Sequence, residues 1–166
     1  ESLNDIKEGD PLKAINRLTS EESKQIFEKT TQYLKAKSLI ILTNAYFENN
    51  RIEDALNQAN IAKITIPVNE NNLLGQIHEL LGMIYNAKQE YNNAKDNFDY
   101  AQRYGNNSIR FLINKSLTNY RLGSYEDAEN DLKLIITNYE NKKIDTYLRN
   151  VLCNAYARMA QIALSK

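Results

Sequence analysis

The residues able to do acid–base, nucleophilic or metal chemistry are few and scattered. His78 is the only histidine and Cys153 the only cysteine. A metal ligand needs further ligands, and no Cys, Asp or second His stands at ligand spacing from His78. A nucleophilic thiol needs a base and an orienting group. We therefore interpret His78 as a core or boundary residue and Cys153 as a packed structural thiol, with ligand and nucleophile roles as the alternatives.

Two acidic pairs, Glu21-Glu22 and Glu126-Asp127, stand where helices are expected to begin. Helix dipoles and capping favour acidic residues there, so a catalytic dyad is the weaker interpretation. The chain has no Gly-rich phosphate loop, no Gly-x-Ser-x-Gly and no metal signature. We therefore expect no catalytic residue, no metal site and no cofactor, and we expect that the protein is not an enzyme.

The composition indicates an ordered helical protein. Of 166 residues, 42% are hydrophobic and 25% charged, which is typical of folded domains. With only 5 Gly and 2 Pro, turn residues are too scarce for a strand-rich fold, which favours an all-α fold. Lys+Arg and Asp+Glu both number 21, so the basic excess of nucleic-acid-binding proteins is missing. No stretch approaches the roughly 20 apolar residues that span a bilayer.

The clearest pattern in the chain is a pair of short helices between Leu81 and Asn106. Apolar or small residues mark the first helix at Leu81, Gly82, Ile84 and Tyr85, and the second at Tyr91, Ala94, Phe98 and Ala101. The spacing of three and four in the second set is helical. Asn86 to Glu90 is polar and turn-prone, and Gly105-Asn106 ends the second helix. Gly82 and Ala94 are small enough to let the two helices approach closely.

This pattern resembles the tetratricopeptide repeat, in a degenerate bacterial-type form. The family signature is Leu-Gly, Tyr three residues later, then Ala, Phe and Ala on a second helix, and a closing Pro, over 34 residues. The matching residues are Leu81-Gly82, Tyr85, Ala94, Phe98 and Ala101, with Tyr91 at the family's early second-helix tyrosine. His78 replaces the family Trp, and Asn106 replaces the closing Pro. The resemblance implies an all-α, right-handed solenoid of helix hairpins.

Three full repeats and two flanking pieces are expected in a single domain. The matched alanines are Ala14, Ala55, Ala94 and Ala128, and their spacings imply repeats of 34–41 residues. We place the repeats at about 20–69, 70–107 and 108–141, after a half repeat at 1–19 and before a capping helix at 144–164. A long helical pattern begins with the capping-box signature at Thr19 to Glu22 and runs to about Phe47.

The resemblance also implies which residues face the concave side of the solenoid, where first helices of repeats lie. These places are Lys37, Ile40, Asn44 and Phe47; Gln76, Glu79, Met83 and Asn86; Arg110, Ile113, Leu117, Tyr120 and Arg121; and Asn150, Asn154 and Arg158. All except Lys37, Ile40, Glu79 and Arg158 are candidate binding residues. The alternative is that neighbouring helices cover the apolar ones. Five other tyrosines take repeat-core places: Tyr46, Tyr85, Tyr91, Tyr125 and Tyr156.

Chaperone-binding members of the family hold carboxylates of a partner's C-terminus with Lys and Asn residues. Asn44 matches one clamp Asn and Arg110 one basic place. Ile40 stands where the first Lys is needed, and Met83 replaces the second Asn, so we disfavour that clamp.

The resemblance thus predicts a non-catalytic module that binds another protein or a peptide in a groove. The alternatives are a peptide-sensing domain of a larger bacterial regulator and a cell-envelope assembly factor. The chain opens with Glu1 rather than Met, which is consistent with a cleaved signal, a removed domain or a shortened chain. Compartment, cytoplasmic or periplasmic, and oligomeric state stay open.

Overall fold

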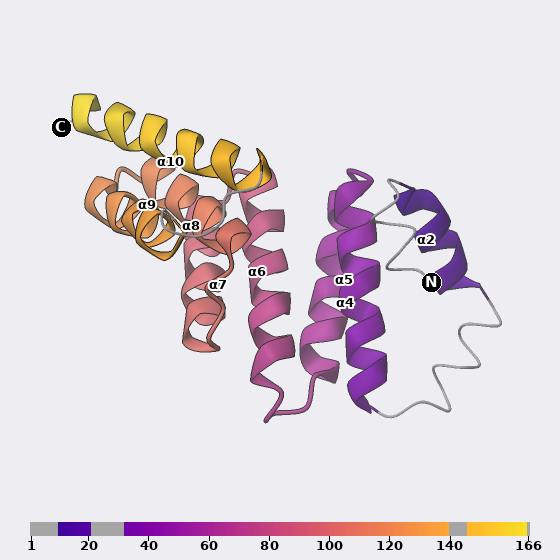
Figure 1. Cartoon of the computed structure of the whole chain (residues 1–166). Helices are drawn as coiled ribbons and strands as arrows, with labels where there is room; N and C mark the ends of the chain where they lie inside the picture. The colour runs from indigo at the N-terminus through magenta and orange to yellow at the C-terminus, as the bar shows by residue number, and fades with distance from the viewer. Residues whose placement is uncertain (1–9, 21–31, 140–145, 166) are drawn as a thin grey trace.

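The computed structural model describes residues 10–20, 32–139 and 146–165, and this part of the chain holds eight α-helices and no strand. The helices are α2 (Pro11–Thr19), α4 (Gln32–Glu48), α5 (Ile52–Thr65), α6 (Asn71–Ala87), α7 (Tyr91–Arg103), α8 (Ile109–Arg121), α9 (Tyr125–Tyr139) and α10 (Thr146–Ser165). They follow one another along the molecule in chain order (Figure 1). None of the described helices is long and apolar enough to cross a bilayer.

In the described part of the chain, successive helices form hairpins, and each hairpin packs on the next. The closest pairs are α4 with α5, α6 with α7, and α8 with α9. The first helices of these hairpins, α4, α6 and α8, also contact one another in turn, while α5 and α7 contact the first helix that follows each of them. The helix axes rotate along the stack, so that α10 lies steeply inclined to α4 and α6 (Figure 1). The expected all-α solenoid of helix hairpins is therefore confirmed.

Capping side chains explain where two of the helices, α2 and α8, begin. The Asp10 carboxylate accepts a hydrogen bond from the backbone N–H of Lys13 at 3.0 Å, with Pro11 in the first turn. Ser108 Oγ accepts from the backbone N–H of Phe111 at 3.2 Å. The turn expected at Asn86 to Glu90 is shorter, because α6 continues through Ala87.

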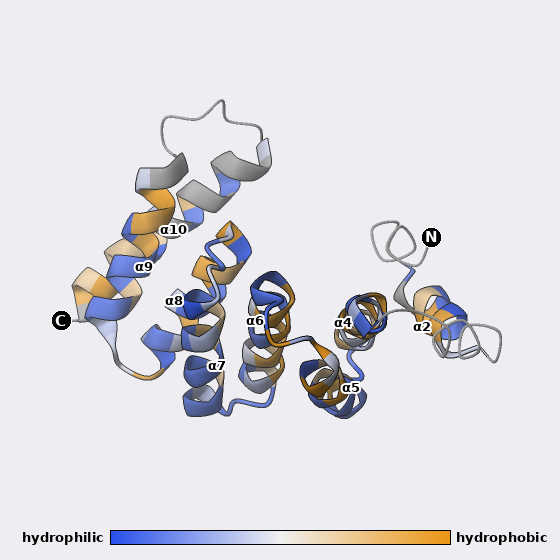
Figure 2. Cartoon of the chain, turned by 90° about the horizontal axis from the view of Figure 1, so that it is seen from below, coloured by the Kyte–Doolittle hydropathy of each residue, from blue (hydrophilic) through white to orange (hydrophobic). Residues whose placement is uncertain are grey.

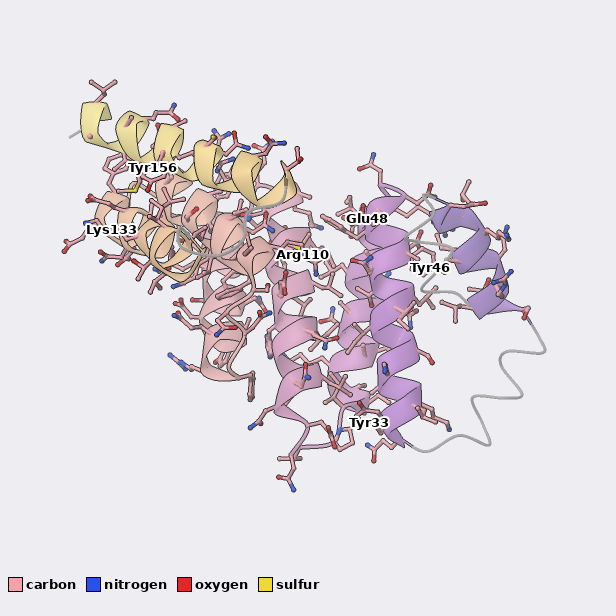
Figure 3. The ribbon with its side chains drawn as sticks, in the orientation of Figure 1. Tyr33, Tyr46, Glu48, Arg110, Lys133 and Tyr156 are labelled. Carbon is pink, nitrogen blue, oxygen red and sulfur yellow. The ribbon has the colours of Figure 1, made fainter. Side chains whose placement is uncertain are left out.

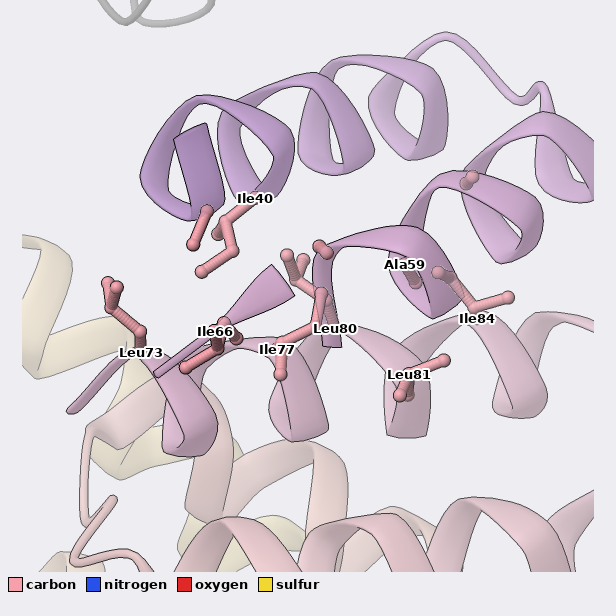
Figure 4. Close-up of a cluster of buried hydrophobic side chains, with 11 residues drawn as sticks. Ile40, Ala59, Ile66, Leu73, Ile77, Leu80, Leu81 and Ile84 are labelled. Atoms are coloured by element: carbon pink, nitrogen blue, oxygen red, sulfur yellow. The ribbon is translucent and has the colours of Figure 1, made fainter. Parts of the chain in front are cut away.

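The apolar stripes of the helices meet in three hydrophobic clusters. The central cluster joins α4, α5 and α6, and Figure 4 shows Ile40, Ala59, Ile66, Leu73, Ile77, Leu80, Leu81 and Ile84 within it. A second cluster joins α7 to α10 around Phe98, Phe111 and Ile135, and a smaller one joins α2 to α4. Each helix carries both apolar and polar residues, as amphipathic helices in a single stacked layer must (Figure 2).

Two sequence-based expectations about packing on α10 are wrong. Cys153 is exposed rather than packed, and Tyr156 is 46% exposed rather than buried in a repeat core. Both positions take their packing from the second helix of their own hairpin. No second helix follows α10 within the described residues, so these side chains face solvent.

The expected helix start at Thr19 to Glu22 lies largely outside the described residues. Thr19 itself is the last residue of α2, and its hydroxyl donates to the carbonyl oxygen of Ile15 at 2.8 Å. The first described residue of the following helix is Gln32.

Candidate functional site

The candidate binding residues lie on α4, α6, α8 and α10, the row of helices that we call the first-helix face. Side-by-side contacts between α4, α6 and α8 make this face continuous. Gln76, Arg110 and Arg121 are exposed on it, as are Asn150 and Asn154 of α10. The other candidates are half-buried, namely Asn44, Phe47, Met83, Asn86, Ile113, Leu117 and Tyr120.

Two of the candidates hold α6 and α8 together through polar contacts. Arg110 Nε donates to Glu79 Oε1 at 2.8 Å, and Glu79 is buried although it is charged. The Asn86 amide donates to Thr118 Oγ1 at 2.8 Å, and Thr118 is completely buried. Arg110 is labelled beside α6 in Figure 3. Charge-assisted and buried hydrogen bonds of this kind fix the spacing of the two helices.

Three apolar candidates serve mainly to pack the face against its supporting helices. Met83 and Ile113 pack on the cluster that joins α7 to α10, and Phe47 packs on the central cluster. Each keeps part of its surface in solvent. Neighbouring helices therefore cover part of each of these three side chains, as the alternative interpretation of the sequence predicts.

The remaining α8 candidates come together in a hollow of about 380 Å³ between α8, α9 and α10, which we call the α8–α10 hollow. Its lining residues are Ser116, Leu117, Tyr120, Arg121, Leu132, Arg158, Gln161 and Ile162. Leu132 and Ile162 are almost completely buried and form its apolar base. The Tyr120 ring is steadied by Tyr125, whose ring centroid lies 5.5 Å away. Arg158, which sequence reasoning placed on the inward side, faces the same hollow as Arg121.

A second hollow, of about 600 Å³, lies between α6 and the segment that joins α7 to α8. Gln76 and Arg110 line it, together with the Glu79 carboxylate that binds Arg110. Asn106 Nδ2 also donates to Glu79, at 2.6 Å. The cation of this hollow is thus already neutralised by a carboxylate within the protein.

The structure contains a buried polar cluster that sequence reasoning missed. Lys115 Nζ lies 3.1 Å from Asp131 Oδ1, and Gln102 Oε1 accepts from the same amine at 2.9 Å. Asn119 donates to the other carboxylate oxygen of Asp131 at 2.9 Å. Burial raises the pKa of Asp131, although the Lys115 charge and both hydrogen bonds oppose that rise. The cluster joins α7, α8 and α9 and presents no charge to a ligand.

His78 is buried, as the sequence interpretation predicts, and its neighbours explain why. Its Nδ1 lies 2.9 Å from Asn97 Oδ1, and its ring lies near those of Tyr100 and Tyr104, with centroids 5.0 and 5.8 Å away. Burial lowers the pKa of His78, and the Lys63 charge lowers it further, while the Asn97 hydrogen bond partly offsets both effects. Nothing about these contacts positions the ring against a substrate.

No group of three His, Cys, Asp or Glu side chains that could hold a metal ion occurs in the described part of the chain.

The sequence matches no protein-family model and no curated protein, but solved structures share its fold. The C-terminal tetratricopeptide-repeat domain of an FK506-binding protein from Plasmodium falciparum is similar at a TM-score of 0.62 and 18% identity, covering 84% of this chain and 99% of that one. MamA from AMB-1 is similar at 0.62 and 14% identity, covering 98% of this chain and 80% of that one. A tetratricopeptide repeat protein from Parabacteroides merdae reaches 0.64 at 18% identity, covering 97% of this chain and 60% of that one. Such identities establish the fold and leave function to be argued from the site.

Proposed function

From the tetratricopeptide-repeat fold of this chain, we propose that the protein is a non-catalytic interaction module. An extended segment or a helix of a partner protein docks on the first-helix face. Solenoids present such a face because their hairpins stack in one layer, so that the first helices line one side of the stack. Apolar anchors of the partner fill hollows, and polar side chains on the face hydrogen-bond its backbone.

The observation that carries this proposal is the α8–α10 hollow. Leu117, Tyr120 and Arg121 lie in one concave site, although only the repeat pattern linked them in the sequence. Its volume of about 380 Å³ lies in the range of natural binding pockets. Half-exposed apolar and aromatic side chains beside arginine are the composition found at the centres of protein interfaces.

The polar contacts between α6 and α8 support different roles for different candidates. Arg110 and Asn86 bind Glu79 and Thr118, so they set the shape of the face. Leu117 and Arg121 are left to contact a partner directly. A substitution at Leu117 should therefore affect binding more than fold, because that side chain keeps part of its surface in solvent.

A pull-down with a matched pair of leucine variants tests the proposal. Leu117→Arg changes the first-helix face, and Leu134→Arg places the same change on α9, where Leu134 is 44% exposed. We expect Leu117→Arg to lose a partner that both wild type and Leu134→Arg retain. Thermal unfolding followed by circular dichroism checks that both variants remain folded. Identical partner lists from folded Leu117→Arg and wild type would contradict the proposal.

A further inference from the structure

Two guanidinium groups, those of Arg121 and Arg158, line the α8–α10 hollow together. Six basic side chains elsewhere pair with carboxylates: Arg51 with Asp54, Lys88 with Glu53, Lys95 with Asp127, Arg110 with Glu79, Lys115 with Asp131 and Lys133 with Glu129. Arg121 and Arg158 form no ion pair with any residue of 10–20, 32–139 or 146–165. Both line the same hollow, and its described lining includes no Asp or Glu.

The base of the hollow is apolar. Leu132 and Ile162 are 1% and 2% exposed and close it from below, while Leu117 and Tyr120 form a wall. A volume of about 380 Å³ is at the low end for binding pockets, with room for about one or two side chains. Such a site suits a small part of a segment that crosses the face, and it is too small to take a whole helix.

We propose that the α8–α10 hollow binds an acidic peptide segment of the partner, in which an apolar side chain lies next to carboxylates. The inference rests on the proposed function and names the partner's chemistry. The apolar side chain packs on Leu132 and Ile162. The flanking carboxylates pair with Arg121 and Arg158, whose planar guanidinium groups bind carboxylates through two parallel hydrogen bonds.

Charge complementarity selects this occupant. A basic segment would bring further positive charge to two guanidinium groups that no carboxylate of the described residues neutralises, which costs free energy. A purely apolar segment would leave both groups partly desolvated without an acceptor. An acidic segment satisfies both guanidinium groups and also covers the apolar base.

Titration of the ¹⁵N- and methyl-labelled protein with blocked synthetic heptapeptides tests this inference by NMR. The probe has a central leucine flanked by glutamates, and two control peptides replace the glutamates by lysines or the leucine by serine. We expect saturable shifts of the Nε–Hε signals of Arg121 and Arg158 and of the Ile162 methyl groups with the acidic peptide. The lysine peptide should give no saturable shift, and the serine peptide should bind more weakly.

Variants then identify the groups responsible. Each of Arg121→Gln and Arg158→Gln should weaken binding by about fivefold, and the double variant by more than about tenfold, since two charge-assisted contacts are lost. Arg103→Gln removes an exposed arginine of α7 that does not line the hollow, and it should bind as wild type does.

Three results would overturn the inference: no shift at millimolar acidic peptide, equal binding of the lysine peptide, or the same shifts from inorganic phosphate with equal affinity. The last result would indicate a site for small anions. A partner that depends on Leu117 in the pull-down would uphold the proposed function even if the acidic peptide failed to bind. The two failures are therefore distinguishable.

Discussion

Gly82 on α6 lies directly against the Phe98 ring of α7, at a place where the sequence pattern predicts a small residue. A Cβ at this position would lie 2.6 Å from Cε1 of Phe98. Phe98 is completely buried and packs edge-on against Phe111, with ring centroids 5.9 Å apart. Its ring therefore has little room to move away.

We predict that Gly82→Ala destabilises the protein by about 1–2 kcal/mol. Overpacking costs about 1–3 kcal/mol, which exceeds the gain of up to about 1 kcal/mol from replacing glycine in a helix. Gly75, on the same helix, is the matched control, because its Cβ would meet neighbours only at 3.5 Å or more. Gly75→Ala should therefore stabilise by up to about 1 kcal/mol. Urea unfolding measures both, and equal shifts in one direction would refute the packing argument.

We expect His78 to link stability to pH, because burial in the folded protein lowers its pKa. Its folded pKa lies below the value of 6.5 expected in the unfolded chain. The unfolded chain therefore takes up a proton more readily as pH falls below 6.5. The stability contributed by His78 is present above pH 6.5 and is lost as pH falls from there towards the folded pKa.

We predict that the free energy of unfolding falls between pH 7.5 and pH 5.5 more steeply in wild type than in His78→Gln. One proton limits the difference in slope to about 1.4 kcal/mol per pH unit. Asp131 has a raised pKa and contributes with the opposite sign, but it is unchanged in the variant and cancels in the comparison. Parallel pH profiles for the two proteins would show that His78 is not the linked group.

The turns between the two helices of each hairpin share one geometry. Asn50, Gln89 and Gly123 occupy corresponding positions with φ of 57°, 61° and 75°. After each, the next backbone N–H bonds back to the last turn of the first helix; for Glu90 the acceptor is the carbonyl oxygen of Tyr85, at 2.9 Å. This is the Schellman ending, which favours glycine at the left-handed position.

Gln89→Gly should consequently stabilise the α6–α7 hairpin, by about 0.5–1 kcal/mol, because glycine adopts a positive φ without steric cost. The same substitution at Gln58, inside α5, should destabilise by about 1 kcal/mol and serves as the control. Thermal melts of both variants measure the effect. A lower melting temperature for Gln89→Gly would contradict the assigned turn.

The burial of a residue was predictable from the sequence where that residue packs within its own hairpin. Ala94, Phe98 and Ala101 are all completely buried, as their spacing predicts. The exposure of Cys153 was not predictable in this way, because it depends on which helix packs beside α10. Pattern alone also gave no sign of the Lys115–Asp131 pair, since charged residues at such positions usually face solvent.

The same distinction applies to the candidate site. The repeat pattern placed Leu117, Tyr120 and Arg121 on one surface, and the structure brings them into one hollow. The repeat pattern could not indicate that Glu79 would bind Arg110 or that Thr118 would bind Asn86. Those contacts join different hairpins, so they depend on the tilt between successive repeats.

At the scale of the whole molecule, the same stacking stabilises the fold and forms the face on which we propose that a partner binds. Three hydrophobic clusters follow one another along the solenoid, and Tyr85 packs against the two larger ones. The second helices carry exposed apolar residues of their own, among them Ile64 on α5, Tyr100 on α7 and Leu134 on α9. The central claim is that a partner binds the first helices and leaves these second-helix residues uncovered.

Hydroxyl-radical footprinting of the complex with a captured partner tests that claim most directly. Met83, Leu117 and Tyr120 report on the first-helix face, and Ile64, Tyr100 and Leu134 report on the second helices. We predict that partner binding reduces oxidation of the first set and leaves the second set as reactive as in the free protein. Protection of Ile64, Tyr100 or Leu134 with unchanged oxidation of Leu117 and Tyr120 would place the partner on the opposite side and contradict the proposed function.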